Sequence, residues 1–246
     1  MPRGDVRIDR LLVERGLALN RERAQRLVMA GGVLVDDRPV TKAGTRVAAD
    51  AVVRLRAAAA PFVSRGGEKL AGALDAFGID VGGQMALDVG ASTGGFTDCL
   101  LQRGARRVVA VDVGRGQLAW TLRQDPRVTL LERTNARRLD PAMLPEVPDL
   151  ATIDVSFISL RLVLPAIARV VAPHASIVAL VKPQFEVGRG RVGKGGVVRD
   201  PGLRAEAVAS VRAAAEGLGL MVRGETESVL PGPKGNREVF LWLGRS

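Results

Sequence analysis

The chain has 246 residues, of which 47% are hydrophobic and 25% charged, which fits one or two folded domains and excludes disordered, collagen-like and disulfide-dense proteins. A single cysteine, Cys99, excludes an intramolecular disulfide and a cysteine-rich zinc site; with no apolar stretch of membrane-spanning length and no signal-peptide pattern, we expect a cytoplasmic protein. The net charge of +10 favours nucleic acid as the partner, and the first 62 residues carry half of it.

Two short helices and a small sheet are predicted at the start of the chain. Apolar residues recur at helical spacing over residues 7–14, and again from Asn20, which offers an N-cap oxygen, to Gly31. Short apolar segments that predict a curled sheet follow at 33–35, 39–40 and 52–55. A unit of this size has room for binding but little for catalysis.

Several arginines lie mainly off the apolar face of the second helix. Over residues 7–55 this part, with the sequence RIDRLLVERGLALNRERAQRLVMAGGVLVDDRPVTKAGTRV, resembles the small RNA-binding domain first known from a ribosomal small-subunit protein, the S-four type. In that family the second helix and the following turn lie against structured RNA. The resemblance implies RNA-binding roles for Arg21, Arg23, Arg26 and Lys42. From the residues alone, a solvated helix face explains the arginines equally well.

Strand and helix patterns alternate after the Ala-rich stretch 57–60 and Pro61, which are typical of a linker. The predicted strands are 84–88, 107–112, 128–131, 150–154 and 176–182. The predicted helices are 94–102, 116–123, 160–171 and 201–217. This alternation predicts an α/β fold with a doubly wound, mostly parallel, Rossmann-like sheet. Residues 221–228 and 238–243 predict a terminal hairpin, so the last strand would be antiparallel.

A glycine-rich turn, residues 90–96, joins the first strand of this sheet to its helix. Glycine lets the backbone approach a ligand, and the helix N-terminus offers free N–H groups. Asp112 ends the next strand, 22 residues after Gly90, where a carboxylate can accept hydrogen bonds from both ribose hydroxyls. The pattern indicates a nucleoside cofactor. Because G-x-x-x-G-G departs from the dinucleotide fingerprint, NAD is the second choice.

The sequence DVGASTGGF is similar to the first motif of S-adenosylmethionine-dependent methyltransferases. The resemblance implies that Asp112 holds the ribose of S-adenosyl-L-methionine and that Asn135, just after the third strand, lies near its adenine. The residues implied to line the methionine side are Asp88, Gly90, Ala91, Ser92, Gly94, Gly95 and Phe96.

Acid–base chemistry would rest on lysines and carboxylates, because the single histidine, His174, follows Pro173 in an expected surface turn. Asp154 and Lys182 each end a predicted strand, at the edge where doubly wound sheets bind their ligands. We expect these two side chains at the cofactor pocket. Taken alone, Lys69 and Glu238 are better explained as surface charges.

The motifs together are similar to one family. SRGGEKL, DVGASTGGFTDCLLQ, DVSFISL, VKPQFEVG and PGPKGNREVF, joined to an S-four-type domain, resemble the TlyA family over nearly the whole chain. Lys69, Asp154, Lys182 and Glu238 match the Lys-Asp-Lys-Glu tetrad of FtsJ-like ribose 2′-O-methyltransferases. The resemblance implies methylation of a cytidine 2′-hydroxyl in ribosomal RNA, on one or both subunits. We expect this transfer to need no metal and Lys182 to take or steer the hydroxyl proton. Because four coupled groups titrate as a set, the sequence leaves open which member of the tetrad is the base. Some family members carry the historical name haemolysin.

We therefore expect an RNA-binding domain over residues 1–56, a linker over 57–63 and a methyltransferase domain over 64–246. The Gly-rich segment 183–199 would clamp RNA beside the pocket through Arg189 and Arg191, or would be an ordinary solvated loop. A non-catalytic RNA-binding or ribosome-assembly protein would explain the charge but not the cofactor loop. A membrane-active haemolysin would need a membrane-seeking segment, and none is evident in the sequence.

Overall fold

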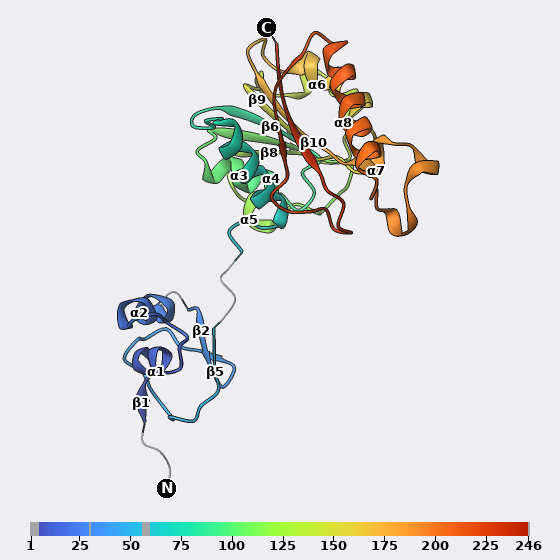
Figure 1. The fold of residues 1–246 in the computed structure, drawn as a ribbon. Helices are drawn as coiled ribbons and strands as arrows, with labels where there is room; N and C mark the ends of the chain where they lie inside the picture. Colours follow the sequence, from blue (N-terminus) through green and yellow to red (C-terminus); the bar gives the residue numbers. More distant parts are fainter. Residues whose placement is uncertain (1–4, 30, 56–59, 246) are drawn as a thin grey trace. The chain divides into compact units, whose positions relative to one another are not determined.

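A computed structural model describes residues 5–29, 31–55 and 60–245, which form two compact units divided between Ala60 and Pro61 (Figure 1). Each unit has its own apolar core. Residues 57–59 of the predicted linker, 57–63, lie outside the described residues.

The first unit packs two helices against short strands. Its elements are β1 (Val6–Arg7), α1 (Ile8–Glu14), α2 (Arg21–Met29), β2 (Val33–Val35), β3 (Arg38–Pro39), β4 (Arg46–Val47) and β5 (Val53–Leu55). Strand β2 pairs antiparallel with β3 and β5, and β1 pairs with β4. The Asn20 side-chain oxygen accepts the backbone N–H of Arg23 at 2.8 Å, as expected for an N-cap. Ile8, Leu12 and Val28 are buried between the helices and the strands.

The second unit is built on a seven-stranded sheet in the described part of the chain, with strand order β11-β12-β10-β9-β6-β7-β8. The strands are β6 (Met85–Val89), β7 (Arg107–Val111), β8 (Val128–Leu131), β9 (Leu150–Ile153), β10 (Ser176–Val181), β11 (Met221–Glu227) and β12 (Val239–Gly244). Strands β6 to β10 run parallel, whereas β12 pairs antiparallel with β10 and β11. The predicted doubly wound, mostly parallel α/β sheet with an antiparallel last strand is confirmed.

Helices cover both faces of this sheet (Figure 1). They are α3 (Arg65–Phe77), α4 (Gly95–Gln102), α5 (Trp120–Arg123), α6 (Leu164–Val170), α7 (Pro183–Glu186) and α8 (Pro201–Glu216). Neighbouring strand residues alternate between two apolar clusters, one under α3 and α4 and the other under α6 and α8, because side chains of a strand point to opposite faces in turn. Both faces are therefore buried, as parallel sheets require.

Three predicted segments differ in detail. The helix predicted over 116–123 is reduced to α5. The one predicted over 160–171 is split into a 3₁₀ turn, η3 (Leu160–Leu162), and α6, which has Pro165 in its first turn. Residues 183–199 are not a plain loop: they contain α7 and the 3₁₀ turns η4 (Arg189–Arg191) and η5 (Lys194–Gly196). The other 3₁₀ turns are η1 (Ala136–Arg138) and η2 (Pro141–Met143).

Over the residues that the structure describes, none of the helices has the length and apolarity to span a membrane.

Candidate active site

The glycine-rich turn between β6 and α4 lies at the carboxyl end of the sheet. Gly90 has a φ of 87°, and a Cβ there would collide with the carbonyl oxygen of Asp154, so only glycine fits. The carboxylate of Asp112, just after β7, accepts the backbone N–H of Ser92 at 2.8 Å and that of Gly114 at 2.7 Å. These bonds fix the turn against the neighbouring strand and leave its backbone exposed to the space above the sheet.

Two cavities adjoin this turn, and both are lined by Gly90, Ser92 and Asp154. The first, of about 490 Å³, is also lined by Ser64, Arg65, Gly66, Lys69, Ala91, Thr93, Gly95, Phe96, Lys182, Pro231, Pro233 and Glu238. The second, of about 420 Å³, is also lined by Val111, Asp112, Val113, Gln117, Thr134, Asn135, Ala136, Val155, Ser156, Phe157, Ile158 and Val163. An extended ligand such as a nucleoside joined to an amino acid can therefore lie across the turn.

The first cavity brings the four predicted tetrad residues together as two ion pairs. The Nζ of Lys69, on α3, lies 2.5 Å from Oε2 of Glu238, which directly precedes β12. The Nζ of Lys182, at the end of β10, lies 2.6 Å from Oδ1 of Asp154, at the end of β9. The Lys69 and Glu238 side chains are 9% and 0% exposed, whereas those of Lys182 and Asp154 are 12% and 23% exposed. The second pair is therefore the one more open to a ligand.

Two of the residues predicted to hold the cofactor line neither cavity. Asp88 is fully buried beneath the turn, where its carboxylate accepts hydrogen bonds from the hydroxyls of Thr97 at 2.6 Å and Thr152 at 3.3 Å. Burial raises the pKa of Asp88 to about 7. Gly94 also lines neither cavity, and a Cβ at this position would collide with the side chains of Leu118 and Leu122. Both residues shape the turn from behind.

Asp112 and Asn135 both line the second cavity. Asn135 directly precedes η1, and its side-chain oxygen accepts the backbone N–H of Arg137 at 3.1 Å. Gln117 and Phe157 line the same cavity and were missed by sequence reasoning. Phe157 is the more informative: its side chain is 92% exposed and its φ is 65°, rare for a bulky residue. The motif DVSFISL does show an aromatic residue just after the end of a predicted strand, which could have pointed to Phe157. The sequence does not show that the ring of Phe157 is exposed.

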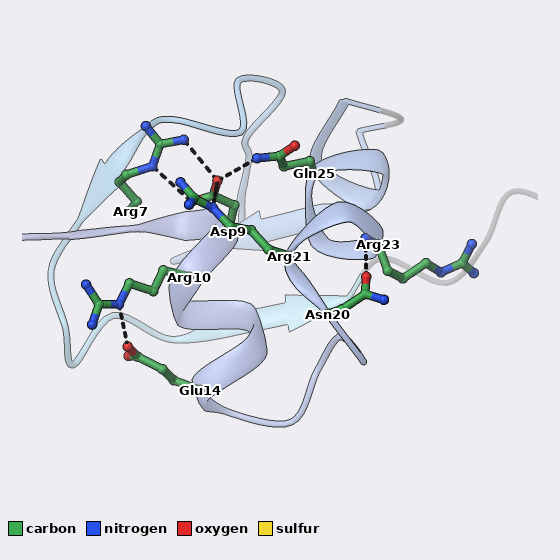
Figure 2. A network of polar contacts seen from close by, with 8 residues as sticks. All are labelled: Arg7, Asp9, Arg10, Glu14, Asn20, Arg21, Arg23 and Gln25. Atoms are coloured by element: carbon green, nitrogen blue, oxygen red, sulfur yellow. Dashed lines mark hydrogen bonds and ion pairs between the residues drawn. The ribbon is translucent and has the colours of Figure 1, made fainter.

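In the first unit, one buried carboxylate holds two arginines (Figure 2). The Asp9 carboxylate, fully buried, accepts hydrogen bonds from Arg7 at 2.9 and 3.1 Å, from Arg21 at 3.1 Å and from Gln25 at 3.0 Å. The hydrogen bond from Arg7 is the main reason why the pKa of Asp9 lies well below its usual range. The Arg7 and Arg21 side chains are still 43% and 61% exposed, so two guanidinium groups are fixed side by side at the surface.

The other predicted RNA-binding residues are arranged differently. Arg23, Arg26 and Lys42 are exposed, and Arg26 pairs with Glu22 at 3.2 Å. Arg191, in η4, forms an ion pair with Glu206 of α8, whereas the Arg189 side chain lies outside the described part of the structure. Among the residues described, no cluster of three His, Cys, Asp or Glu side chains could hold a metal ion.

Comparison with known proteins gives the same two-part organisation. The family of FtsJ-like methyltransferases matches residues 62–245, and the S4 domain, the S-four type, matches residues 6–53. A 16S/23S rRNA (cytidine-2′-O)-methyltransferase TlyA from Mycobacterium tuberculosis strain H37Rv is 54% identical, over 97% of this chain and 89% of the relative. Hemolysin A from Brachyspira hyodysenteriae is 39% identical, over 95% of this chain and 97% of the relative.

A solved structure also resembles the whole chain. A hemolysin candidate from Streptococcus thermophilus has a TM-score of 0.75 and 42% identity, covering 99% of this chain and 89% of that one. More distant is the magnesium protoporphyrin IX methyltransferase of Synechocystis, with a TM-score of 0.52 and 14% identity over 74% of this chain and 83% of that one. The distant likeness shows a shared fold.

Proposed function

This chain belongs to the TlyA family of FtsJ-like methyltransferases, and from that premise we propose that it methylates a cytidine ribose 2′-hydroxyl in ribosomal RNA of the small or large subunit, or both. The observation that carries the proposal is the cavity in which two lysine–carboxylate pairs face a glycine-rich turn. Because ribosomal subunits would be the substrate, we also propose a cytoplasmic location. We further propose an RNA-binding domain over residues 1–56, a linker over 57–63 and a methyltransferase domain over 64–246.

The residues around the turn fit S-adenosylmethionine. The backbone of the turn is uncovered because Gly90 has no side chain, and the Asp112 carboxylate keeps lone pairs for ribose hydroxyls beside the two backbone N–H groups that it accepts. Gln117 and Asn135 line the cavity in which the adenine would lie. When bound, S-adenosylmethionine supplies an electrophilic methyl group on its sulfonium.

Asp112→Ala is expected to weaken binding of S-adenosylmethionine by about 10-fold or more. The variant lacks the carboxylate that accepts the backbone N–H groups of Ser92 and Gly114 and that would accept the ribose hydroxyls. Titration calorimetry measures this. Asp80→Ala is a matched control, since Asp80 also accepts a backbone N–H in a turn but lines neither cavity. Equal affinity of the Asp112 variant and wild type would contradict the ribose assignment.

Within the first cavity, the chain would act mainly by alignment and by handling one proton. Transfer requires the hydroxyl oxygen, the methyl carbon and the leaving sulfur in line, which favours a fixed acceptor position. Lys182 is held by Asp154 and by a 2.9 Å hydrogen bond to the hydroxyl of Ser156, so its Nζ has a defined place in the cavity wall. As the O–H bond and the methyl–sulfur bond break and the new O–C bond forms, Lys182 with Asp154 takes or steers the proton, and the electron pair of the broken methyl–sulfur bond stays on the leaving sulfur. The buried Lys69–Glu238 pair would hold another part of the wall of the same cavity.

RNA binding would begin at the paired guanidinium groups of Arg7 and Arg21. Each guanidinium keeps N–H donors beyond those given to Asp9, and planar forks of this kind match phosphate oxygens. The exposed ring of Phe157 lines the same cavity as Asp154 and suits stacking on an unpaired base.

Arg21→Ala is expected to weaken RNA binding at low salt and to reduce the slope of log K against log salt by about 0.7 to 0.9, the value for one lost phosphate contact. Arg10→Ala is the matched control, because Arg10 is exposed on α1 and pairs with Glu14 (Figure 2). Filter binding to ribosomal RNA across a salt series measures both variants. An unchanged slope in the Arg21 variant would remove this residue from the interface.

Two other functions make different predictions. A non-catalytic RNA-binding or assembly protein would bind ribosomal RNA without binding S-adenosylmethionine, which calorimetry decides. A membrane-active protein, as the name of the Brachyspira relative suggests for that relative, would release dye from liposomes at physiological salt. Labelled methyl transfer to ribosomal subunits, with neither liposome leakage nor transfer to DNA, is the result that the proposal expects.

A further inference from the structure

A buried carboxylate lies next to the cavity but is not part of the tetrad. The Glu186 side chain, at the end of α7, is 1% exposed. Its Oε1 accepts the backbone N–H of Leu160 at 2.8 Å, and its Oε2 accepts the hydroxyl of Ser159 at 2.5 Å. Both partners belong to the segment that follows β9, so Glu186 joins the chain after β10 to the chain after β9.

These two segments carry the pair that faces the substrate. Segment 154–160 includes Asp154 and Ser156, which contact Lys182, four residues before Glu186. The ring of Phe185 packs against that of Phe157, with centroids 5.2 Å apart. Lys182, Phe185 and Glu186 therefore link the two segments, and Glu186 is the most buried of the three.

Segment 154–160 needs such links because its own backbone does not hold it. Residues 154–159 are in neither helix nor strand, and Phe157 adopts a left-handed φ that costs about 1 kcal/mol or more. Hydrogen bonds from neighbouring structure must fix a stretch of this kind. The hydrogen bonds from Ser159 and Leu160 to Glu186 fix the end of the segment, where η3 begins.

The link has a cost, which indicates that it does more than fill space. Burial raises the pKa of Glu186, meaning that the ionised form is disfavoured there, and only the Ser159 and Leu160 donors and the Arg161 guanidinium, 3.7 Å away, offset this. An apolar side chain would fill the same volume without the penalty but could not accept either hydrogen bond.

We propose that Glu186 is a positioning residue for methyl transfer, which holds segment 154–160 so that Asp154 and Ser156 keep Lys182 in place. This inference rests on the methylation proposed above. Glu186 itself touches neither substrate nor cofactor, since it lines neither cavity. Its effect would pass through the segment that it anchors.

The test compares Glu186→Ala with Glu186→Gln. We expect Glu186→Ala to lower kcat on ribosomal subunits by about 10- to 100-fold, the cost of a displaced catalytic group, with a smaller change, under about fivefold, in the Kd of S-adenosylmethionine. Hydrogen exchange of amides in 155–162 should rise at the same time. Glu186→Gln can still accept from Leu160 and donate to the Ser159 oxygen, so it should keep kcat within about threefold.

The control and the contrary results separate the two proposals. Val211→Ala, on the buried face of α8, should lower the melting temperature without changing kcat. If Glu186→Ala fails to fold, Ser159→Ala removes one of the two bonds and should lower kcat and raise exchange in the same direction. Unchanged kcat in these variants, or an equal loss in Val211→Ala, would overturn the positioning role. Wild-type protein that methylates no RNA would instead refute the proposed function, while unchanged hydrogen exchange in Glu186→Ala would still refute the anchoring of segment 154–160 by Glu186.

Discussion

Replacing Lys182 by alanine is expected to abolish methyl transfer while binding of S-adenosylmethionine survives. In the proposed mechanism Lys182 takes or steers the ribose proton, and its Nζ is fixed by Asp154 at 2.6 Å and Ser156 at 2.9 Å. Loss of a positioned acid–base group costs about 10²- to 10⁴-fold in rate. Lys182 does not line the second cavity, in which the adenosine would lie, so affinity for the cofactor should change little. Single-turnover transfer and calorimetry measure the two quantities on the same preparation.

A second variant separates charge from proton handling. Lys182→Arg keeps a cation beside Asp154, but a guanidinium does not give up its proton in proteins. We expect this variant to bind the cofactor and to transfer at a rate near that of the alanine variant. Full turnover by either variant would contradict the role given to Lys182.

Glu238→Ala is expected to be the most destabilising single change in the site. It leaves the Lys69 ammonium, 9% exposed, without its 2.5 Å partner, and breaking a buried ion pair from one side costs about 3–5 kcal/mol. Urea unfolding followed by tryptophan fluorescence measures this directly, because both tryptophans, Trp120 and Trp242, belong to the second unit.

The double variant Lys69→Met with Glu238→Leu is the control for this prediction. Apolar residues of similar volume often replace a buried pair at little cost in stability, so the double variant should unfold at a higher urea concentration than Glu238→Ala. It should remain inactive, since both charges are gone from the cavity wall. A single variant within about 1 kcal/mol of wild type would show that solvent already screens the pair.

The sheet was predictable because its signals are local. Apolar runs of strand length, alternating with helical patterns, give β6 to β10 to within a residue or so. Strands β1 and β4 have two residues each and carry no such signal. Asp154 and Lys182 could be placed at one edge because parallel strands end together.

The remaining contacts depend on tertiary structure. Lys69 and Glu238 are 169 positions apart, and they can pair only when α3 is packed on the sheet and β12 has paired antiparallel with β10. Asp9 accepts hydrogen bonds from both Arg7 and Arg21, and Glu186 accepts one from Ser159. These contacts depend on side-chain orientations that cannot be derived from the spacing of residues in the sequence. The burial of Asp88 behind the turn, rather than in the cavity, likewise depends on Thr97 and Thr152.

The most direct test is to incubate the protein with purified small and large ribosomal subunits and methyl-labelled S-adenosylmethionine, and then to digest the RNA to nucleosides. We expect label in 2′-O-methylcytidine, from one or both subunits, that is lost with Lys182→Ala. Label on a base, label in DNA offered as competitor, or no label from protein that binds the cofactor would contradict it.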